Sequence, residues 1–180
     1  MKNAALIVID VQQAFDDPSW GPRNNPQLEA NVAALLRAWR ARGAPLFHVR
    51  HMSMEPRSLL RPGLPGNAFK PEAAPLPGER VIEKSVNSAF IGTPLEAELR
   101  ARGLDTVVLC GIQTNHCVST TTRMAGNLGF KTFLVGDACA TFDRRALDGR
   151  TFPAQLIHDV ALADLHGEFA TVIDTARAAG

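Results

Sequence analysis

Three residues of types that catalyse acyl transfer follow predicted strands that lie far apart in the chain. Asp10 ends the apolar run "AALIVID" at 4–10, Lys84 lies near the end of "ERVIEKS" at 79–85, and Cys117 follows "TVVLCG" at 106–111 by a short loop. A thiolate attacks a carbonyl carbon, and a carboxylate can take the thiol proton and pass it to a departing amine. We predict that Asp10, Lys84 and Cys117 are catalytic, with Lys84 and the start of the next helix stabilising a thiolate.

Each of these residue types also has a common structural role. A cysteine is often a small buried hydrophobe, an aspartate at a strand end often caps a turn, and a lysine is usually a solvated charge. Cys110 lies inside an apolar run and Cys139 lies between alanines, so we interpret both as packing residues. Cys117 differs from them because its loop is polar, and this difference favours a chemical role.

The pattern of apolar runs predicts strands that alternate with helices. The expected strands are 4–10, 45–51, 79–85, 106–111, 131–137 and 168–174, and the expected helices are 27–43, 94–103, 115–128 and about 151–167. Continuous apolar runs are typical of strands covered on both faces, and the alternation indicates right-handed βαβ units. We predict an α/β fold of three layers, α/β/α and Rossmann-like, with a central parallel six-stranded sheet, in a single domain over 1–180.

In such a sheet, ligands bind beyond the carboxyl ends of the strands. We expect the strands at 4–10, 79–85 and 106–111 to neighbour one another, which would bring the three candidate catalytic residues to one edge. The proline-rich stretch 52–78 is interpreted as a long functional loop, a lid or an irregular excursion. Loops of this kind shape a pocket and its specificity.

Composition excludes several classes of protein. The chain has 180 residues and a formal net charge of +1, which disfavours nucleic-acid and membrane-surface partners. Three cysteines at wide spacing form neither a disulfide framework nor a zinc motif, and no glycine-rich phosphate loop follows the first strand. The first residues lack a signal-peptide pattern, and no apolar stretch is long enough to span a membrane. We expect a cytoplasmic protein with a small-molecule substrate.

Three segments resemble the motifs of the isochorismatase-like cysteine hydrolases. They are "VIDVQQAF" (8–15), "EKSVNSAF" (83–90) and "GIQTNHCVSTTTRMAGNLGF" (111–130), and the resemblance runs in order from about residue 4 to residue 173. It implies that Asp10 is the catalytic aspartate, Lys84 the lysine of the third strand and Cys117 the nucleophile. It also implies a homo-oligomer, a dimer or tetramer, for which the loop 52–78 and the last helix are candidate contact surfaces.

The resemblance further implies how the pocket is built. The peptide bond between Ile112 and Gln113 would be cis, and the backbone amides of Gln113 and Cys117 would form an oxyanion hole. Phe15 matches an aromatic residue that lines the pocket in relatives. No cofactor is implied.

Further residues are candidates for substrate contact. Trp20 lies in the loop after the first strand, His51 at the end of the second, and Asn87 shortly after Lys84; each has a packing or loop-stabilising alternative. We expect His116 to face away from the site. His48 and His51 are three residues apart on a strand and so point to opposite faces, which argues against a metal site and against nicotinamide as substrate.

These observations predict a cysteine-dependent amidohydrolase that cleaves a C–N bond of a small amide, carbamoyl or ureido substrate through a thioester. Two alternatives stay open. One is hydrolysis of an isochorismate-type vinyl ether, for which a cysteine is unnecessary. The other is a non-catalytic redox or ligand-binding protein that uses a reactive Cys117.

Overall fold

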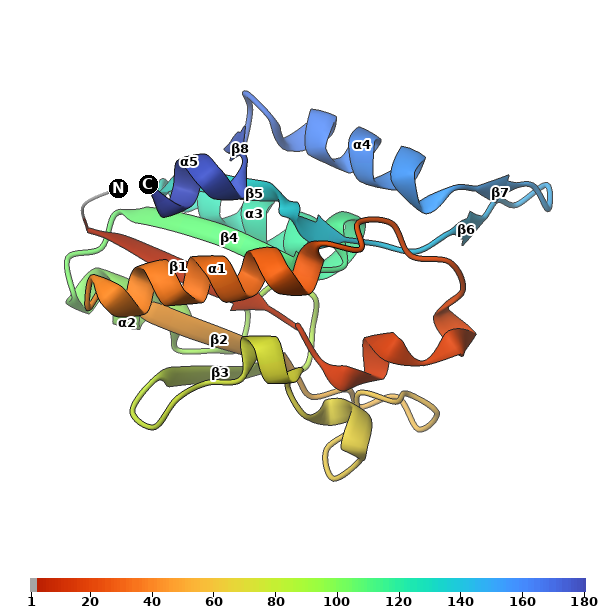
Figure 1. The fold of residues 1–180 in the computed structure, drawn as a ribbon, viewed down its shortest axis with the longest axis horizontal. Coiled ribbons are helices and arrows are strands. Elements are labelled where there is room, and N and C mark those ends of the chain that lie inside the picture. The colour runs from red at the N-terminus through yellow and green to blue at the C-terminus, as the bar shows by residue number, and fades with distance from the viewer. Residues whose placement is uncertain (1–2) are drawn as a thin grey trace.

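The computed structural model describes residues 3–180, so the first two residues of the domain predicted over 1–180 lie outside the described part. Its main sheet has six parallel strands in the order β3-β2-β1-β4-β5-β8 (Figure 1), which confirms the predicted sheet. The strands are β1 (Ala4–Ile9), β2 (Leu46–His51), β3 (Arg80–Lys84), β4 (Thr106–Ile112), β5 (Lys131–Ala140) and β8 (Thr171–Ile173). A small antiparallel hairpin, β6 (Arg144–Arg145) and β7 (Thr151–Phe152), lies outside this sheet and was not expected.

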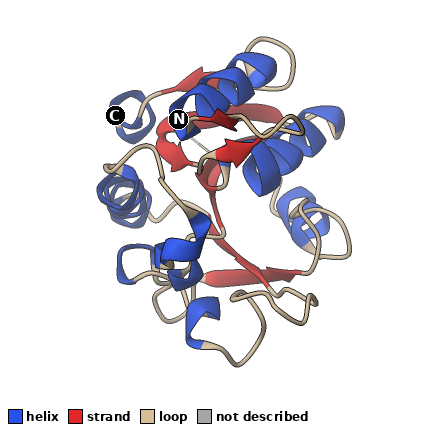
Figure 2. Ribbon diagram, turned by 90° about the vertical axis from the view of Figure 1, so that its right-hand side faces the viewer, coloured by secondary structure: helices blue, strands red, loops and turns tan. Residues whose placement is uncertain are grey.

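Helices cover both faces of the sheet, which confirms the three layers (Figure 2). They are α1 (Leu28–Ala41), α2 (Leu95–Ala101), α3 (Ser119–Asn127), α4 (Ala154–Leu165) and α5 (Thr175–Ala179). In Figure 1, α1 and α5 lie on the near face, and α2 and α3 lie behind the sheet, with α4 packed beside α3. Within residues 3–180, no helix has the length and apolar character that crossing a bilayer requires.

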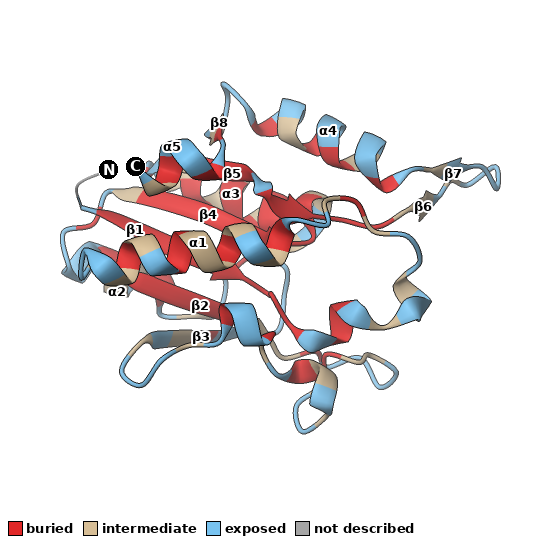
Figure 3. Ribbon diagram, in the orientation of Figure 1, coloured by how far each residue is buried: buried red, intermediate tan, exposed pale blue. Residues whose placement is uncertain are grey.

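The core forms where the apolar runs of the sequence meet. Every residue of β1 is buried, as expected for a central strand covered on both faces (Figure 3). The apolar stripe of α1, which includes Leu35 and Trp39, is also buried against the sheet. Trp39 donates its indole N–H to the carbonyl oxygen of Ala4 over 3.0 Å, so its one polar atom is satisfied inside the core.

The strand order corrects one prediction. β1 lies between β2 and β4, and β3 lies beyond β2, so the first and third strands are not neighbours. The chain starts at the centre of the sheet, adds β2 and β3 outward in succession, and then returns across β1 to form β4. The first and fourth strands therefore frame the point where the order reverses, which is where ligands bind in such sheets. Lys84 still reaches the site because it pairs in register with His51 at the end of β2.

The strands β1 and β4 approach very closely at their carboxyl ends. Gly111 pairs with Ile9 and has a φ of 134°, and a Cβ placed there would lie 1.9 Å from the Ile9 carbonyl oxygen. Only glycine fits this position. The peptide bond between Ile112 and Gln113, which is the second after Gly111, is cis, as the family resemblance implied.

Candidate active site

Asp10 and Lys84 form a buried ion pair at the carboxyl edge of the sheet. Asp10 directly follows β1 with a φ of 52°, a conformation that aspartate tolerates better than most residues. The Lys84 ammonium donates to Asp10 Oδ2 over 2.7 Å, and the two side chains are 0% and 1% exposed. The lysine is therefore not a solvated charge. Its Nζ also lies 2.9 Å from Nδ1 of His51.

Cys117 lies beside this pair. It belongs to a π-helical turn, Thr114–Val118, that precedes α3, and its side chain is half-buried. The Cys117 sulfur, a carboxylate oxygen of Asp10 and a ring nitrogen of His51 all lie within 4.8 Å of one another. Asp10 Oδ1 is buried and has no hydrogen-bond partner among residues 3–180, so this oxygen is available to accept a proton. The structure thus brings the three predicted catalytic residues together.

The predicted resting thiolate is wrong. Burial raises the pKa of the Cys117 thiol to about 12, and the negative charge of Asp10 adds to the effect of burial, while Lys84 offsets only part of it. The helical turn Thr114–Val118 continues directly into α3, so Cys117 does lie in the first turn of a helix as expected, but this position does not offset the effect of burial. At neutral pH the site holds a neutral thiol next to an Asp10–Lys84 ion pair. Any attack by the sulfur therefore requires transfer of its proton to a nearby base.

The donor atoms of Asp10, His51 and Cys117 are close enough to be considered as a metal site. The Lys84 ammonium, however, lies 2.7 Å from Asp10 and 2.9 Å from His51, so a positive charge already contacts two of the three candidate ligands. These residues do not fit a bound cation. His48 has separate surroundings, since its ring nitrogens lie 3.1 Å from the Ala73 carbonyl oxygen and 2.9 Å from Glu79 Oε2. The two histidines face different environments, as the strand alternation predicted.

A cavity of about 230 Å³ opens onto the thiol. Its lining residues are Asp10, Phe15, Trp20, His51, Leu60, Asn87, Gln113, His116, Cys117 and Arg144. All four predicted substrate-binding residues are among them. A larger hollow of about 780 Å³ lies between α3 and α4, and none of the predicted catalytic residues lines it.

The predicted substrate-binding residues approach the cavity from different elements. The ring centroids of Phe15 and Trp20 are 5.1 Å apart, and Phe142 packs against both, so these rings form an aromatic wall. Asn87 Oδ1 lies 3.9 Å from the Cys117 sulfur, at the limit of a weak thiol hydrogen bond. Burial and the Lys84 charge lower the pKa of His51, so its ring is neutral at pH 7 and Nδ1 can accept from the ammonium.

The oxyanion-hole prediction concerns the backbone of Gln113 and Cys117. Gln113 follows the cis bond at the end of β4 and lines the cavity. Among residues 3–180, its backbone N–H has no hydrogen-bond acceptor. An unsatisfied N–H at the edge of a cavity is a suitable donor to a substrate oxygen.

Three lining residues were not predicted as part of the pocket. His116, which we expected to face away, lines the cavity because the π-helical turn presents successive side chains differently from an α-helix. Leu60 comes from the loop 52–78, so this loop covers the cavity of its own chain. Arg144 comes from β6, and no local signal in "DRRALDGR" separates it from Arg145.

Buried amide side chains hold the loop 52–78 over the site. Gln12 donates to the carbonyl oxygens of Asn67, at 2.8 Å, and of His51, at 3.2 Å. Asn67 in turn donates to the carbonyl oxygens of Leu60, at 2.6 Å, and of His51, at 2.8 Å. Gln12 belongs to the first quoted motif, and these contacts explain why an amide is needed there: it satisfies a loop that would otherwise bury unpaired backbone groups.

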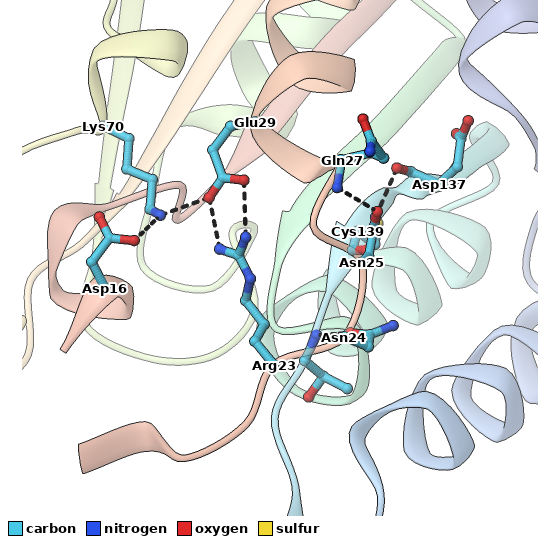
Figure 4. Close-up of polar contacts among 10 residues, drawn as sticks. Asp16, Arg23, Asn24, Asn25, Gln27, Glu29, Lys70, Asp137 and Cys139 are labelled. Atoms are coloured by element: carbon cyan, nitrogen blue, oxygen red, sulfur yellow. Dashed lines mark hydrogen bonds and ion pairs between the residues drawn. The ribbon is translucent and has the colours of Figure 1, made fainter. Parts of the chain in front are cut away.

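A second polar cluster fixes the segment that carries the aromatic wall (Figure 4). Lys70, which is 3% exposed, bridges Asp16 and Glu29, and Arg23 forms a bidentate pair with Glu29 at 2.6 and 2.9 Å. Burial raises the pKa of Glu29, but the hydrogen bonds from Arg23 and Lys70 outweigh it and lower the pKa to about 2. The segment before α1, which includes Trp20, is thereby tied to the first turn of that helix.

The model of the family described as "Isochorismatase domain" matches residues 4–177. Among curated proteins, the chain is 48% identical to the isochorismatase family protein YrdC of Bacillus subtilis (strain 168), over 95% of this chain and 91% of that protein. It is 30% identical to Nicotinamidase 3 of Arabidopsis thaliana, over 96% and 85% of the two chains.

Solved structures agree with these sequence relationships. A hydrolase of the isochorismatase family from Chromobacterium violaceum ATCC 12472 superposes with a TM-score of 0.96 at 54% identity, over 99% of this chain and 93% of that one. A cysteine hydrolase from Pseudomonas syringae pv. phaseolicola 1448A superposes with a TM-score of 0.89 at 26% identity, over 98% and 91% of the two chains.

Proposed function

Because this chain belongs to the isochorismatase-like family of cysteine hydrolases, we propose that it is an amidohydrolase that cleaves a C–N bond of a small amide, carbamoyl or ureido compound. One observation carries the proposal. The Cys117 thiol lies within 4.8 Å of the Asp10 carboxylate, which pairs with the buried Lys84 ammonium, and both Cys117 and Asp10 line a cavity of about 230 Å³. This arrangement combines a nucleophile with a base that can return a proton to a leaving nitrogen.

In the first step, the Cys117 sulfur attacks the substrate carbonyl carbon while its proton moves to Asp10 Oδ1. The high pKa of the thiol requires that these two events be coupled, since the thiolate is scarce at rest. The negative oxygen that develops accepts hydrogen bonds from the backbone N–H groups of Gln113 and Cys117. Such donors typically contribute about 10²–10³ in rate each.

In the second step, the C–N bond breaks and Asp10 gives its proton to the departing ammonia or amine. The acyl group remains on Cys117 as a thioester. Asp10, again a carboxylate, then takes a proton from water as the water oxygen attacks the thioester, and the sulfur leaves and regains a proton. Lys84 stays protonated throughout and holds the Asp10 carboxylate in position by their 2.7 Å contact.

The site favours this reaction over the two alternatives. Hydrolysis of a vinyl ether requires no nucleophilic sulfur. Here the Cys117 thiol lies beside the Asp10 carboxylate, whose Oδ1 has no hydrogen-bond partner among residues 3–180. A peroxide sensor reacts through an accessible thiolate, whereas the pKa of about 12 for the Cys117 thiol leaves little thiolate at neutral pH. Cys110 and Cys139 are fully buried and offer no exposed resolving thiol.

A screen of small amides, carbamoyl compounds and lactams with detection of ammonia tests the proposal. We expect turnover of at least one compound by the native protein and none by Cys117→Ala, with unchanged thermal unfolding of the variant. Mass spectrometry of the native protein during turnover should show an acyl adduct on Cys117. Substantial amidase activity in Cys117→Ala would refute the covalent route.

A further inference from the structure

A buried hydrogen bond joins α4 to the turn that carries the nucleophile. His158 belongs to the buried stripe of α4, and this helix packs against the turn Thr114–Val118. Nδ1 of His158 lies 2.9 Å from the Thr114 hydroxyl, and the two residues are 6% and 0% exposed. Among residues 3–180, that hydroxyl has no other hydrogen-bond partner. Neither residue lines the cavity of the thiol, so neither is a candidate for contact with the substrate.

Thr114 directly follows Gln113, whose free backbone N–H is the candidate oxyanion donor. The Gln113 carbonyl oxygen accepts the N–H of His116 at 3.0 Å and the N–H of Val118 at 3.3 Å. Both bonds lie within the turn, so they shape it without fixing how it sits relative to the cavity. An attachment to another element is needed for that, and the bond between Thr114 and His158 supplies one. Because this bond is buried at both ends, it is stronger than a similar bond in water.

We propose that His158 is a positioning residue of the reaction: through Thr114 it holds the Gln113 N–H in the direction that the substrate oxygen requires. Its effect on turnover rests on the proposed function, whereas its effect on an adduct of the thiol does not. An oxyanion donor acts only when it points at the oxygen that develops in the transition state, and a misplacement of about 1 Å can cost roughly 10² in rate. A side chain outside the cavity can therefore control kcat.

The chemistry of the ring indicates which substitutions keep this bond. Burial lowers the pKa of His158, and the charge of Asp159 offsets only part of that effect, so the ring is neutral at pH 7. A neutral imidazole has one donor nitrogen and one acceptor nitrogen, and a hydroxyl can bond with either. Asparagine also offers a donor and an acceptor, at about the distance of Nδ1 from the backbone, whereas leucine offers neither.

Four variants separate positioning from stability: His158→Leu, His158→Asn, Thr114→Val and the double variant Thr114→Val/His158→Leu. His158→Leu leaves the Thr114 hydroxyl buried without a partner, which should lower the midpoint of thermal unfolding. The double variant removes both polar groups and should recover much of that midpoint. His166→Leu is the matched control, because His166 lies just beyond the last turn of α4 and its Nδ1 accepts the N–H of Val172 at 3.0 Å.

A reversible aldehyde adduct reports the oxyanion donors without turnover. Butyraldehyde forms a thiohemiacetal with Cys117: the sulfur bonds to the carbonyl carbon, the π electrons move to the oxygen, and the thiol proton ends on that oxygen, so nothing is oxidised or released. The dissociation constant is measured from the protection of Cys117 against iodoacetamide, followed by mass spectrometry. Iodoacetamide is attacked at its methylene carbon and develops no oxyanion, so its own rate reports the thiol and the cavity.

We expect the dissociation constant of butyraldehyde to rise about tenfold in His158→Leu and Thr114→Val, and to stay raised in the double variant although the unfolding midpoint recovers. His158→Asn should restore most of the affinity, and His166→Leu should match the native protein. The rate with iodoacetamide alone should be similar throughout. A native dissociation constant in folded Thr114→Val, an affinity that recovers in the double variant, or a parallel loss of the iodoacetamide rate would overturn the inference. Thr114→Val gives this test even if His158→Leu does not fold.

Turnover separates this inference from the proposed function. With an amide that the screen identifies, kcat should fall about tenfold or more in His158→Leu with little change in KM, and His158→Asn should recover most of it. Equal kcat in the native protein and His158→Leu supports the amidohydrolase and refutes the positioning role. Weaker binding of butyraldehyde in the variants, without cleavage of any amide by the native protein, supports the positioning role and refutes the amidohydrolase.

Discussion

Replacing Asp10 with asparagine should change turnover and thiol reactivity in opposite directions. Turnover should be lost, because asparagine cannot accept the thiol proton or deliver it to the leaving nitrogen. The Cys117 thiol, however, should become easier to ionise, because the carboxylate charge is among the causes that raise its pKa to about 12. Removing a nearby negative charge lowers the pKa of the thiol and increases the thiolate fraction at any pH below it.

The magnitude follows from the geometry. The Asp10 oxygen and the Cys117 sulfur lie within 4.8 Å. Two unit charges at that separation interact by about 1 kcal/mol at a dielectric constant of about 80 and by about 3.5 kcal/mol at about 20. A thiolate of lower basicity is also a weaker nucleophile, which removes nearly half of the gain on a logarithmic scale. Alkylation of Cys117 by iodoacetamide should therefore be roughly 2- to 25-fold faster in Asp10→Asn than in the native protein.

The assay is the rate of carbamidomethylation at Cys117, followed by mass spectrometry between pH 7 and pH 9. Cys110 and Cys139 are buried and should stay unmodified in folded protein, so they report any unfolding. Lys84→Met is the matched control, since removal of the positive charge should slow the same reaction. An Asp10→Asn protein that is folded and is alkylated at the native rate, or more slowly, would refute the electrostatic account of the site.

Three further predictions concern stability and assembly. Gly111→Ala should lower the free energy of unfolding by several kcal/mol, because the new Cβ would lie 1.9 Å from the Ile9 carbonyl oxygen. Gly129→Ala, where φ is positive but the space is open, should lower it by only about 1 kcal/mol. Chemical denaturation measures both variants, and equal losses of unfolding free energy would contradict the argument. Glu29→Gln should lower the midpoint of thermal unfolding at neutral pH, and the difference from the native protein should shrink as the pH falls from about 4.5 towards 2. The Glu29 carboxyl, whose pKa is lowered to about 2, stabilises the fold when it is ionised, by about 3 kcal/mol at most, and loses this contribution when it is protonated. A difference in unfolding midpoint between Glu29→Gln and the native protein that does not change with pH would refute this role of Glu29. Finally, we expect a dimer or tetramer in solution, and light scattering that gives 19.4 kDa at working concentration would contradict it.

The fold was largely predictable because it depends on patterns that are local in the sequence. Each expected strand is present, and the bounds differ from the prediction by a few residues, most of all at the final strand, β8. The apolar run at 4–10 is buried on both faces as predicted, and the stripe that contains Trp39 packs on the sheet. The order of the strands was only partly predictable, because the position of β3 depends on how successive crossovers add strands outward.

The candidate site was predictable in its residues but not in its electrostatics. Asp10, Lys84 and Cys117 each end or follow a strand, so the topology of a parallel sheet brings them to one edge. The state of the thiol depends on how deeply it is buried and on which neighbouring charge is nearer, and neither quantity can be read from residue types. For the same reason the prediction of a thiolate was wrong.

Arg144 shows the limit of sequence reasoning most clearly. It is one of two adjacent arginines in a hairpin that pairs with no strand of the main sheet, and only the packing of that hairpin places one guanidinium in the cavity and leaves the other in solvent. The sequence by itself determined the six strands of the main sheet, the helices α1 to α4 and the chemical types that meet at the sheet edge, because these follow from periodicity and from the direction of the strands. The tertiary structure alone decided the protonation of the sulfur and which arginine lines the pocket, because both depend on burial and on distances between residues remote in the chain.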